Sequence, residues 1–349
     1  MRSLFRRNRT TVGLDVGSGF VKAVVIDHSG SQPEITNVAY TPLRGDAIVE
    51  GEIMDPQIVI EAIQSLFETM AIAPKNVITS VGGRDVIIKR IQMDRMKEAD
   101  AREVIRWEAE QHVPFDMENV QLDFQILDPD AEGLQMSVLL VAAKREVVDQ
   151  KVALLRDAGL SPSIVDVDAF ALHNAFEYNY PDALDGVVAL VSIGNEVTTV
   201  NVLNEGVPVL TRDVPFGSRR LREKLRRMHG LTATEAEAVI QNQSPRQAEF
   251  RQLLAEGGDE LAMGVERAVA FLSMDSAAGR GLSRVYLCGG GARTPELADA
   301  VAARLRVRTE VANPLQRLRI RPGAAALFPA EDLAPMLMLP VGLALRAAA

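Results

Sequence analysis

The sequence predicts an α/β fold made of two related halves, with a smaller α+β segment inserted into the first half. A strand, a glycine-bearing turn and a returning strand occur twice, over residues 11–26 and 187–203. Helical patterns follow both hairpins, an alternation that is typical of α/β proteins. A stretch of strands and charged helices, from about residue 80 to residue 163, interrupts the first half.

The elements of the first half follow from the spacing of apolar residues. Residues 11–16 and 20–26 predict a hairpin with glycines at its tip. Residues 56–70 carry apolar side chains at the spacing of one helical face. Residues 77–81 and 85–91 predict strands that two glycines separate.

The inserted segment is predicted to be a small sheet with helices packed on it. A helix over residues 97–112 is expected to end before Pro114. We interpret Trp107 as the anchor of this helix on the sheet rather than as a platform for a ligand. The remaining predicted elements are strands at 120–127 and 136–143, a helix at 146–158 and a strand at 163–167.

The second half repeats the first in pattern rather than in residue identity. Strands at 187–193 and 197–203 flank a turn at 194–196, and residues 217–278 are mostly helical in pattern. A strand at 284–287 runs into three glycines, and a helix is predicted at 295–305.

The composition is that of a soluble globular chain and limits its partners. The 349 residues, 47% hydrophobic and 24% charged, suffice for two or three modules with buried cores. A net charge of -9 disfavours broad binding to nucleic acid. A single cysteine, Cys288, excludes an internal disulfide and a Cys-cluster zinc site. With no signal peptide or bilayer-length apolar run, we expect a cytoplasmic protein that reaches a membrane through a partner.

Three glycine turns are candidate phosphate sites, because backbone N–H groups beside glycine approach anions without obstruction. The turns lie at residues 17–19, 194–195 and 289–291. Beside the first turn, Asp15 could hold a metal ion through water, while Ser18 and Lys22 could reach phosphate oxygens. Alternatively, Asp15 caps the turn and Lys22 is an ordinary exposed lysine on an edge strand.

Four segments of the chain are informative when they are taken together. They read Gly-Leu-Asp-Val-Gly-Ser-Gly-Phe-Val-Lys (13–22), Ile-Arg-Trp-Glu-Ala-Glu-Gln-His-Val-Pro-Phe (105–115), Thr-Arg-Asp-Val-Pro-Phe-Gly (211–217) and Leu-Cys-Gly-Gly-Gly-Ala (287–292). These segments resemble those of the PilM family of type IV pilus proteins. The similarity runs in order from about residue 9 to residue 346, and the Trp-Glu-Ala-Glu segment separates this family from other actin-like proteins. The resemblance implies an actin-like (RNase H-like) fold of duplicated domains, with an inserted α+β subdomain as in the cell-division protein FtsA.

The resemblance also implies four subdomains and a nucleotide site between the halves. Subdomain 1A would comprise residues 1–80, 164–185 and 330–349, subdomain 1C residues 81–163, subdomain 2A residues 186–216 and 283–329, and the helical subdomain 2B residues 217–282. ATP and Mg²⁺ are the implied cofactors, with Asp15 holding Mg²⁺ through water and Glu237 near the ribose. The implied nucleotide-binding residues are Asp15, Gly17, Ser18, Gly19, Lys22, Gly194, Asn195, Gly217, Glu237, Gly289, Gly290 and Gly291.

Two positions depart from the family pattern. Ser192 stands where the second loop usually has an aspartate, which removes a carboxylate that could place the metal ion and the attacking water. Ile240 stands where a lysine often follows the Glu-Ala-Glu segment. We therefore expect nucleotide binding with slow or absent hydrolysis, and we assign no catalytic residue.

Other polar residues have simpler interpretations. Asp166 and Asp168 could orient water near the cleft, but we interpret Asp168 as the cap of a helix over residues 169–176. The basic run at 219–227 is interpreted as a solvated helix surface, and the arginines among residues 2–9 as a solvated tail. The histidines lack metal-ligand spacing: His28, His112, His173 and His229.

The resemblance supplies a partner and a role. Members of the family hold the cytoplasmic N-terminal tail of the membrane protein PilN in a groove between subdomains 1A and 1C. We expect an ATP-binding scaffold, peripheral at the inner membrane, that links the alignment complex to the pilus motor ATPases in pilus biogenesis and twitching motility. The alternatives are an active actin-like ATPase and an FtsA-like filament-forming protein. A homo-oligomer is left open for the protein in each case, the scaffold included.

Overall fold

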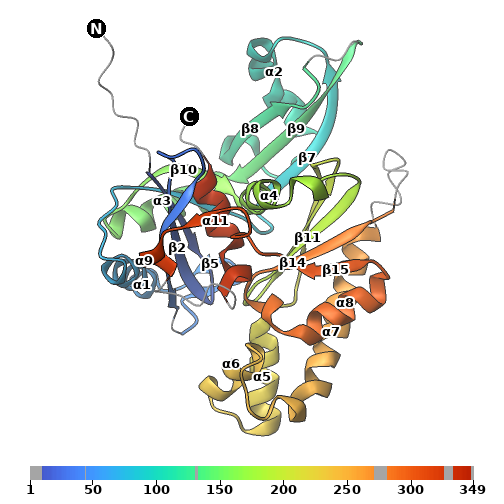
Figure 1. Ribbon diagram of the computed structural model, residues 1–349. Coiled ribbons are helices and arrows are strands. Elements are labelled where there is room, and N and C mark those ends of the chain that lie inside the picture. The colour runs from blue at the N-terminus through green and yellow to red at the C-terminus, as the bar shows by residue number, and fades with distance from the viewer. Residues whose placement is uncertain (1–9, 44, 130–132, 271–280, 326–332, 347–349) are drawn as a thin grey trace.

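Two large sheets, each flanked by helices, form the body of the molecule (Figure 1). The computed structural model describes residues 10–43, 45–129, 133–270, 281–325 and 333–346. The first sheet has the strand order β10-β6-β1-β2-β3-β16. Its strands are β1 (Thr10–Val16), β2 (Phe20–Asp27), β3 (Glu34–Pro42), β6 (Asn76–Val81), β10 (Ser161–Val167) and β16 (Arg319–Ile320). A two-stranded hairpin, β4 (Ile48–Val49) and β5 (Glu52–Ile53), follows β3 in the chain.

The second sheet has the order β13-β12-β11-β14-β15 and begins with a hairpin like that of the first. In both hairpins two antiparallel strands pair along their whole length, β1 with β2 and β11 with β12. The repeated pattern seen in the sequence therefore corresponds to a repeated element. The strands are β11 (Val187–Ile193), β12 (Thr198–Asn204), β13 (Val207–Val214), β14 (Arg284–Cys288) and β15 (Arg308–Val311).

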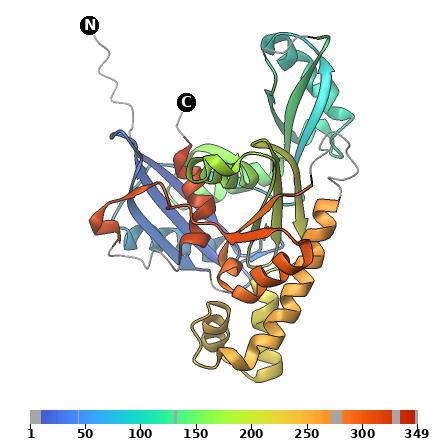
Figure 2. The same ribbon diagram turned by 45° about the vertical axis from the view of Figure 1, so that its right-hand side comes forward.

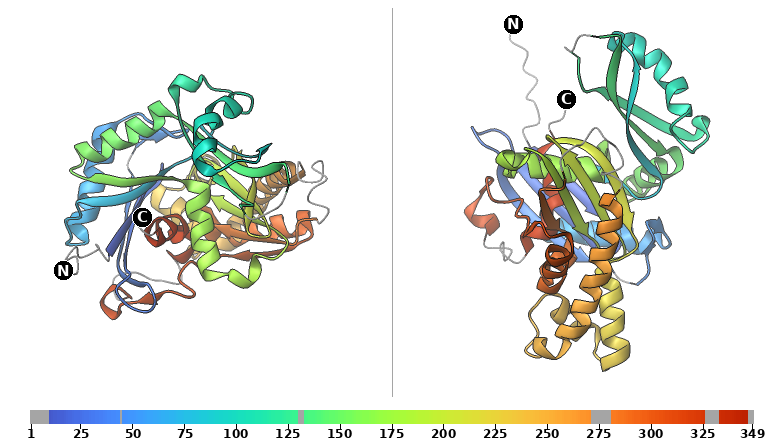
Figure 3. Two further views of the ribbon diagram at one scale, coloured as in Figure 1. Left: turned by 90° about the horizontal axis from the view of Figure 1, so that it is seen from above. Right: turned by 90° about the vertical axis from the view of Figure 1, so that its right-hand side faces the viewer.

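Helices cover both sheets and fill the space between them (Figure 3). Apolar residues of α1 and α3 share one core with the outer face of the first sheet. Helices α4 and α11 pack between the sheets, and α5 to α8 cover the far face of the second sheet. The helices are α1 (Pro56–Thr69), α3 (Arg145–Asp157), α4 (Asp168–Asn179), α5 (Ser218–His229), α6 (Ala233–Ile240), α7 (Gln247–Ala270), α8 (Pro295–Leu305), α9 (Pro322–Ala325) and α11 (Met338–Leu345).

A separate three-stranded sheet stands at one end of the molecule (Figures 1 and 3). It has the order β7-β9-β8, and helix α2 shares a core with it. We call this part the small sheet unit. It comprises β7 (Val86–Asp94), α2 (Glu98–Glu110), β8 (Val120–Ile126) and β9 (Gln135–Lys144).

The small sheet unit is shorter than the predicted inserted segment, residues 81–163. Helix α3 packs with α1 in the core of the first sheet, where Leu155 is fully buried. Strand β10 pairs with β6 in the same sheet. The sequence did not show that α3 packs with the first sheet, because apolar spacing marks a helix but not the sheet on which it docks.

The predicted burial of Trp107 was also wrong, because its side chain is 74% exposed. Helix α2 docks on the small sheet through Ala101, Ile105 and Ala109. Trp107 follows Ile105 by two positions, which turns it about 200° around the helix from that contact. The helix is therefore anchored by small and β-branched residues, and the tryptophan faces outward.

None of the helices in the described ranges has both the length and the hydropathy needed to cross a bilayer.

Candidate functional site

The tips of the two hairpins meet, which brings the first and second predicted loops together. The Gly17 N–H donates to the carbonyl of Phe20 at 3.1 Å, and the Gly194 N–H donates to the carbonyl of Val197 at 3.0 Å. The two turns thus have the same internal hydrogen bond. Across the gap, Asn195 Nδ2 donates to Ser18 Oγ at 3.4 Å. A Cβ placed on Gly19 would lie 3.0 Å from Asn195 Cβ.

An ion pair lies directly beneath the first turn. Lys22 Nζ is 2.5 Å from Asp15 Oδ2, and the two side chains are only 14% and 12% exposed. Strand β2, which carries Lys22, lies between β1 and β3. The alternative interpretation of Lys22 as an exposed lysine on an edge strand is therefore wrong.

Ser192 occupies the place in the second hairpin that Asp15 occupies in the first. Both residues precede the turn glycine by two positions, and they pair with Thr199 and Lys22 respectively. The side chain of Ser192 hydrogen-bonds to the Cys288 thiol, while burial raises the pKa of that thiol to about 12. The second hairpin therefore presents a hydroxyl where the first presents a carboxylate.

Asp168, which the sequence interpretation assigned to a helix cap, is a further carboxylate close enough to Asp15 to be affected by its charge. It is the first residue of α4, whose N-cap is Val167, and no side chain caps this helix. The predicted cap was therefore wrong. Ser80 Oγ instead donates to Asp168 Oδ1 at 2.5 Å, a contact that exists only because β6 lies beside β10.

Polar or charged side chains from other elements, among them β6, β1 and α3, act on Asp168. Burial raises its pKa, the hydrogen bond from Ser80 lowers it, and the negative charge of Asp15 raises it further. Burial lowers the pKa of Lys151, on α3, and the charges of Asp168 and Asp15 oppose that shift. Asp166, by contrast, pairs with Arg346 at 2.6 Å and is 5% exposed, so it serves a structural contact.

Gly217 supports the second turn rather than offering free donors. The N–H groups that follow it are occupied, with Ser218 donating to the Gly194 carbonyl at 3.0 Å and Arg219 to the Asn195 carbonyl at 2.8 Å. A Cβ on Gly217 would lie 2.3 Å from the Asn195 carbonyl oxygen. The absence of a side chain lets the start of α5 close on the turn.

A chain of polar contacts continues from the second turn to α6. Arg222 hydrogen-bonds to Asn195 Oδ1 and donates through Nη1 to Glu237 Oε2 at 3.0 Å. Glu237 Oε1 accepts from Gln241 Nε2 at 2.7 Å. Arg293, beyond the third turn, donates to Gln241 Oε1 at 3.5 Å. Helix α6 thus connects the second and third turns.

An open hollow of about 410 Å³ lies beside Glu237. Ile240, at the departure from the family pattern, does not line it, because this residue is 1% exposed and packs in the core. The residues that line the hollow are Ala233, Thr234, Glu237, Ala238, Gln241 and Gln243.

The third turn packs closely on the end of β11, since a Cβ on Gly291 would lie 2.2 Å from Ile193 Cγ2.

Sequence reasoning missed Arg222, Gln241 and Arg293, and it assigned Asp168 to a helix cap. Arg222 belonged to a basic run interpreted as solvated, yet its side chain is only 20% exposed. Its position one turn after Ser218, on the face toward α6, was the one available signal. Contacts between α6 and the third turn join residues far apart in the chain, and the spacing of residues along the chain does not reveal them.

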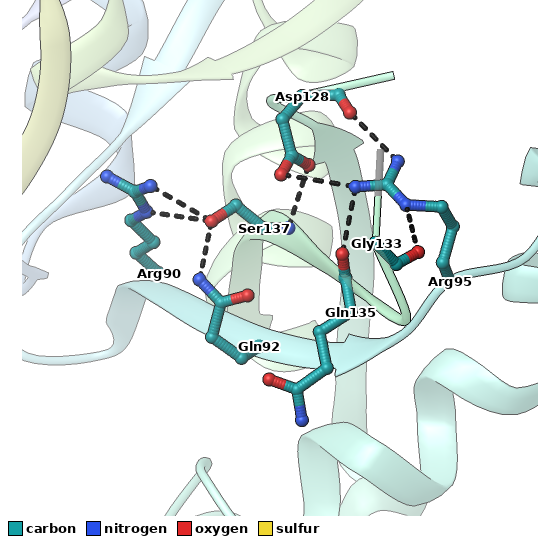
Figure 4. Close-up of polar contacts among 7 residues, drawn as sticks. All are labelled: Arg90, Gln92, Arg95, Asp128, Gly133, Gln135 and Ser137. Carbon is teal, nitrogen blue, oxygen red and sulfur yellow. Dashed lines mark hydrogen bonds and ion pairs between the residues drawn. The ribbon is translucent and has the colours of Figure 1, made fainter. Parts of the chain in front are cut away.

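A second hollow, of about 680 Å³, lies on the small sheet unit between the start of α2 and strand β8. Arg95 fixes its rim by donating to the carbonyls of Asp128 at 3.0 Å, Gly133 at 3.1 Å and Gln135 at 2.8 Å (Figure 4). Its apolar lining comes from Met96, Phe124, Ile126, Pro129 and Met136.

Comparisons with known proteins agree over nearly the whole chain. The family described as type IV pilus assembly protein PilM matches residues 13–348. A solved PilM–PilN type IV pilus biogenesis complex contains a chain that is 28% identical, with a TM-score of 0.82, over 97% of this chain and 98% of that one.

More distant structures share the fold. The ethanolamine utilization protein EutJ from Carboxydothermus hydrogenoformans is 18% identical, with a TM-score of 0.59, over 97% of this chain and 90% of that one. MreB5 of Spiroplasma citri bound to ADP is 13% identical, with a TM-score of 0.52, over 96% and 95%. The predicted actin-like fold is confirmed.

Proposed function

The chain belongs to the PilM family of type IV pilus assembly proteins, and from this we propose that it is an ATP-binding scaffold for the cytoplasmic tail of PilN. The observation that carries the nucleotide part is the meeting of the two hairpin tips above the Lys22–Asp15 pair. The similarity to a chain of the solved PilM–PilN complex supports PilN as the partner. Membrane association through PilN, and linkage from the alignment complex to the pilus motor ATPases for twitching motility, belong to the same proposal.

The polyphosphate would lie between the hairpin tips. Backbone N–H groups of the glycine turns, Lys22 and Arg222 supply the positive potential that phosphate oxygens need. The hollow beside Glu237 would receive the adenosine, with the third turn along its edge. The ADP bound to the MreB5 structure supports a nucleotide in this fold.

Asp15 fits a Mg²⁺ ion held through water. This ion is usually bound by one or two carboxylates together with substrate phosphates and several waters. Within the described ranges no cluster of three or more His, Cys, Asp or Glu side chains is arranged for a metal ion. Phosphate oxygens and water would supply the remaining ligands of such an ion, and its charge would offset part of the charge of the phosphates. With Ser192 in the second hairpin, slow or absent hydrolysis is expected.

Contacts lead from the site to the small sheet unit. Gly82, the first residue of the link from β6 to β7, packs on Asp168 so closely that a Cβ there would lie 2.2 Å from Oδ2. Glu196 of the second turn accepts from the Glu50 N–H at 2.8 Å, and Glu50 pairs with Arg84 at 2.8 Å. The Arg84 pair is exposed and contributes little by itself, so the packing on Asp168 is the stronger connection. A nucleotide that changes the cleft would thereby bias the position of the small sheet unit and the groove beside it.

The deciding experiment titrates a PilN tail peptide into the purified protein with and without ATP. Binding that ATP strengthens or weakens by several-fold is the expected result. Equal affinities would remove the regulatory part of the proposal, and no binding in either condition would remove the scaffold part.

A matched pair of variants tests the nucleotide site itself. Lys22→Ala leaves Asp15 without its partner and removes a phosphate contact, so ATP affinity should fall about 10- to 100-fold. Lys75→Ala removes an exposed lysine far from the turns and should leave ATP affinity unchanged. Calorimetric titration of both variants measures this, and equal affinities would place the nucleotide elsewhere.

A further inference from the structure

Helix α3 carries a half-buried lysine, Lys151, that has no ion-pair or side-chain hydrogen-bond partner among the described residues. The helix packs on the first sheet through Leu154, Leu155 and Ala158, which lie in the core that it shares with α1. Lys151 precedes these three residues by three, four and seven positions, so it lies on the same face of the helix. Its side chain therefore leaves the helix on the side of the sheet rather than on the side of solvent.

The ammonium of Lys151 lies near the carboxylates beside the first turn. The negative charges of Asp168 and Asp15 both act on it, and both oppose the effect of burial, which lowers its pKa. Asp15 already has a partner in Lys22, at 2.5 Å, and Asp168 accepts a hydrogen bond from Ser80. Lys151 is thus close to two carboxylates and bonded to neither.

This arrangement is typical of a site for an anion rather than of a structural ion pair. Removing a charge from water is unfavourable unless the charge is paired and hydrogen-bonded. A lysine that served only to neutralise Asp168 would form a salt bridge with it, as Lys22 does with Asp15. The unpaired ammonium of Lys151 instead keeps its donors available for a ligand that enters the cleft.

The position of Lys151 determines which part of a nucleotide it would meet. From the hollow beside Glu237, contacts lead through Arg222 to Asn195 on the second turn, and from there to Ser18 on the first. Beyond the first turn, β6 and β10 follow β1 in the sheet, and α3 contacts both of these strands. A nucleotide with its adenosine in the hollow and its phosphates between the hairpin tips therefore has its last phosphate toward Lys151.

We propose that Lys151 binds the terminal phosphate of ATP and makes the site prefer ATP to ADP. The inference rests on the proposed nucleotide site and adds the residue that recognises the third phosphate. Asp15 and Asp168 already place negative charge at this end, so a terminal phosphate without a cation beside it would be repelled. An ammonium is a compact charge with three donors that can turn to phosphate oxygens. Lys22, beneath the first turn, instead serves both nucleotides.

Lys151 also lies close to the place where the small sheet unit joins the body. Strand β9 ends at Lys144 and α3 begins at Arg145, with no residue between them. The small sheet unit stands apart from the two large sheets, and β9 runs from it back to the body (Figures 1 and 2). Lys151 follows this junction by less than about two helical turns. ATP and ADP would therefore differ in a contact made at the base of this unit.

A comparison of ATP with ADP tests the proposal. Lys151→Met removes the charge and keeps most of the apolar stem, so affinity for ATP should fall about 10-fold or more, while affinity for ADP should change less than about three-fold. Lys151→Arg keeps the charge and should keep the preference for ATP. Arg156→Met removes one positive charge from the exposed side of the same helix and should leave both affinities unchanged. Calorimetric titrations with magnesium, using a non-hydrolysable ATP analogue and ADP, measure these affinities.

Retained binding of ADP shows that Lys151→Met is folded. A measurement on the wild type avoids the question of folding, because ATP but not ADP should protect Lys151 from reductive methylation, as read by mass spectrometry. Equal protection by both nucleotides or by neither, or an equal change of both affinities in Lys151→Met, would overturn the proposal and leave the nucleotide site standing. A wild type that binds neither nucleotide would overturn the nucleotide site, and this inference with it.

Discussion

Asp15 and Ser192 show how one residue in a duplicated element shapes the expected chemistry. They occupy the same register position in the two hairpins, but only Asp15 carries a charge, and it is paired with Lys22 at 2.5 Å. The serine hydroxyl is instead hydrogen-bonded to the Cys288 thiol. A second turn preceded by a hydroxyl has less means to orient an attacking water than a turn preceded by a carboxylate.

A carboxylate at position 192 should raise the rate of ATP hydrolysis. Ser192→Asp should increase the rate of ATP turnover in magnesium by at least about ten-fold, in the lower part of the range that positioned acid–base groups contribute. Ser192→Asn has similar size without the charge and should leave the rate near that of the wild type. Phosphate release measures both, and equal rates for the two variants would contradict the interpretation.

His173, on α4, predicts how stability depends on pH. Its Nε2 is buried without a hydrogen-bond partner among the described atoms, and burial lowers its pKa against the opposing charge of Glu177. In the unfolded chain a histidine side chain has a pKa near 6.5. As pH falls through that value toward the lowered folded pKa, the unfolded state binds a proton that the folded state resists, so stability is lost.

We therefore expect the free energy of unfolding to fall between about pH 7 and pH 5.5, around the unfolded pKa of histidine. His173→Leu should make this decrease less steep. Urea unfolding at several pH values measures the slope. His112→Leu, which alters a histidine of the small sheet unit, is the comparison, and a slope changed as much by that variant would contradict the assignment.

At the scale of elements, the spacing patterns predicted the positions of strands and helices better than the interpretation of single residues predicted their contacts. Both hairpins, the helix at α1 and the helix at α8 lie where apolar spacing, Pro at the helix start and glycine turns placed them. Each of these signals is local, because it depends on residues within one or two turns of each other. Asp168 and Trp107 were assigned wrongly because their partners, or the lack of partners, depend on other elements.

The third turn offers a matched pair of glycines. Gly291→Ala brings a Cβ within 2.2 Å of Ile193 Cγ2, whereas Gly290→Ala meets nothing within 4 Å. The first change should cost about 1–3 kcal/mol of stability, as overpacking in a tight contact does. The second should cost less than about 1 kcal/mol, the usual range for substitutions at open positions. Denaturant unfolding measures both, and equal costs would contradict the packing of this turn on β11.

At the scale of the whole molecule, the layers bring the turns together. Helices α4 and α11 hold the two sheets on either side of a shared core, and the hairpin tips then meet at Ser18 and Asn195. The small sheet unit joins this body through the link after β6, where Gly82 touches Asp168, and through the junction of β9 with α3. Of the two routes described between the turns and this unit, the packing of Gly82 on Asp168 is stronger than the exposed Arg84–Glu50 pair.

Blocking this connection should uncouple two binding events. Gly82→Ala would displace Asp168 or the link, so ATP and the PilN tail should each still bind, while ATP no longer changes the tail affinity. Gly323→Ala, where a Cβ meets nothing within 4 Å, should keep the coupling. Peptide titrations with and without ATP measure it. Unchanged coupling in Gly82→Ala would show that the signal takes another route.

The sequence by itself determined the local elements, the duplicated hairpins and the three glycine turns, because periodicity and turn chemistry act over a few residues. The tertiary structure alone decided which turns meet, that Asp168 faces Ser80, that α3 joins the first sheet and that Trp107 points outward. These are contacts, or missing contacts, between segments far apart in the chain. Their physical basis is the close packing of layers, which fixes positions that no local pattern encodes.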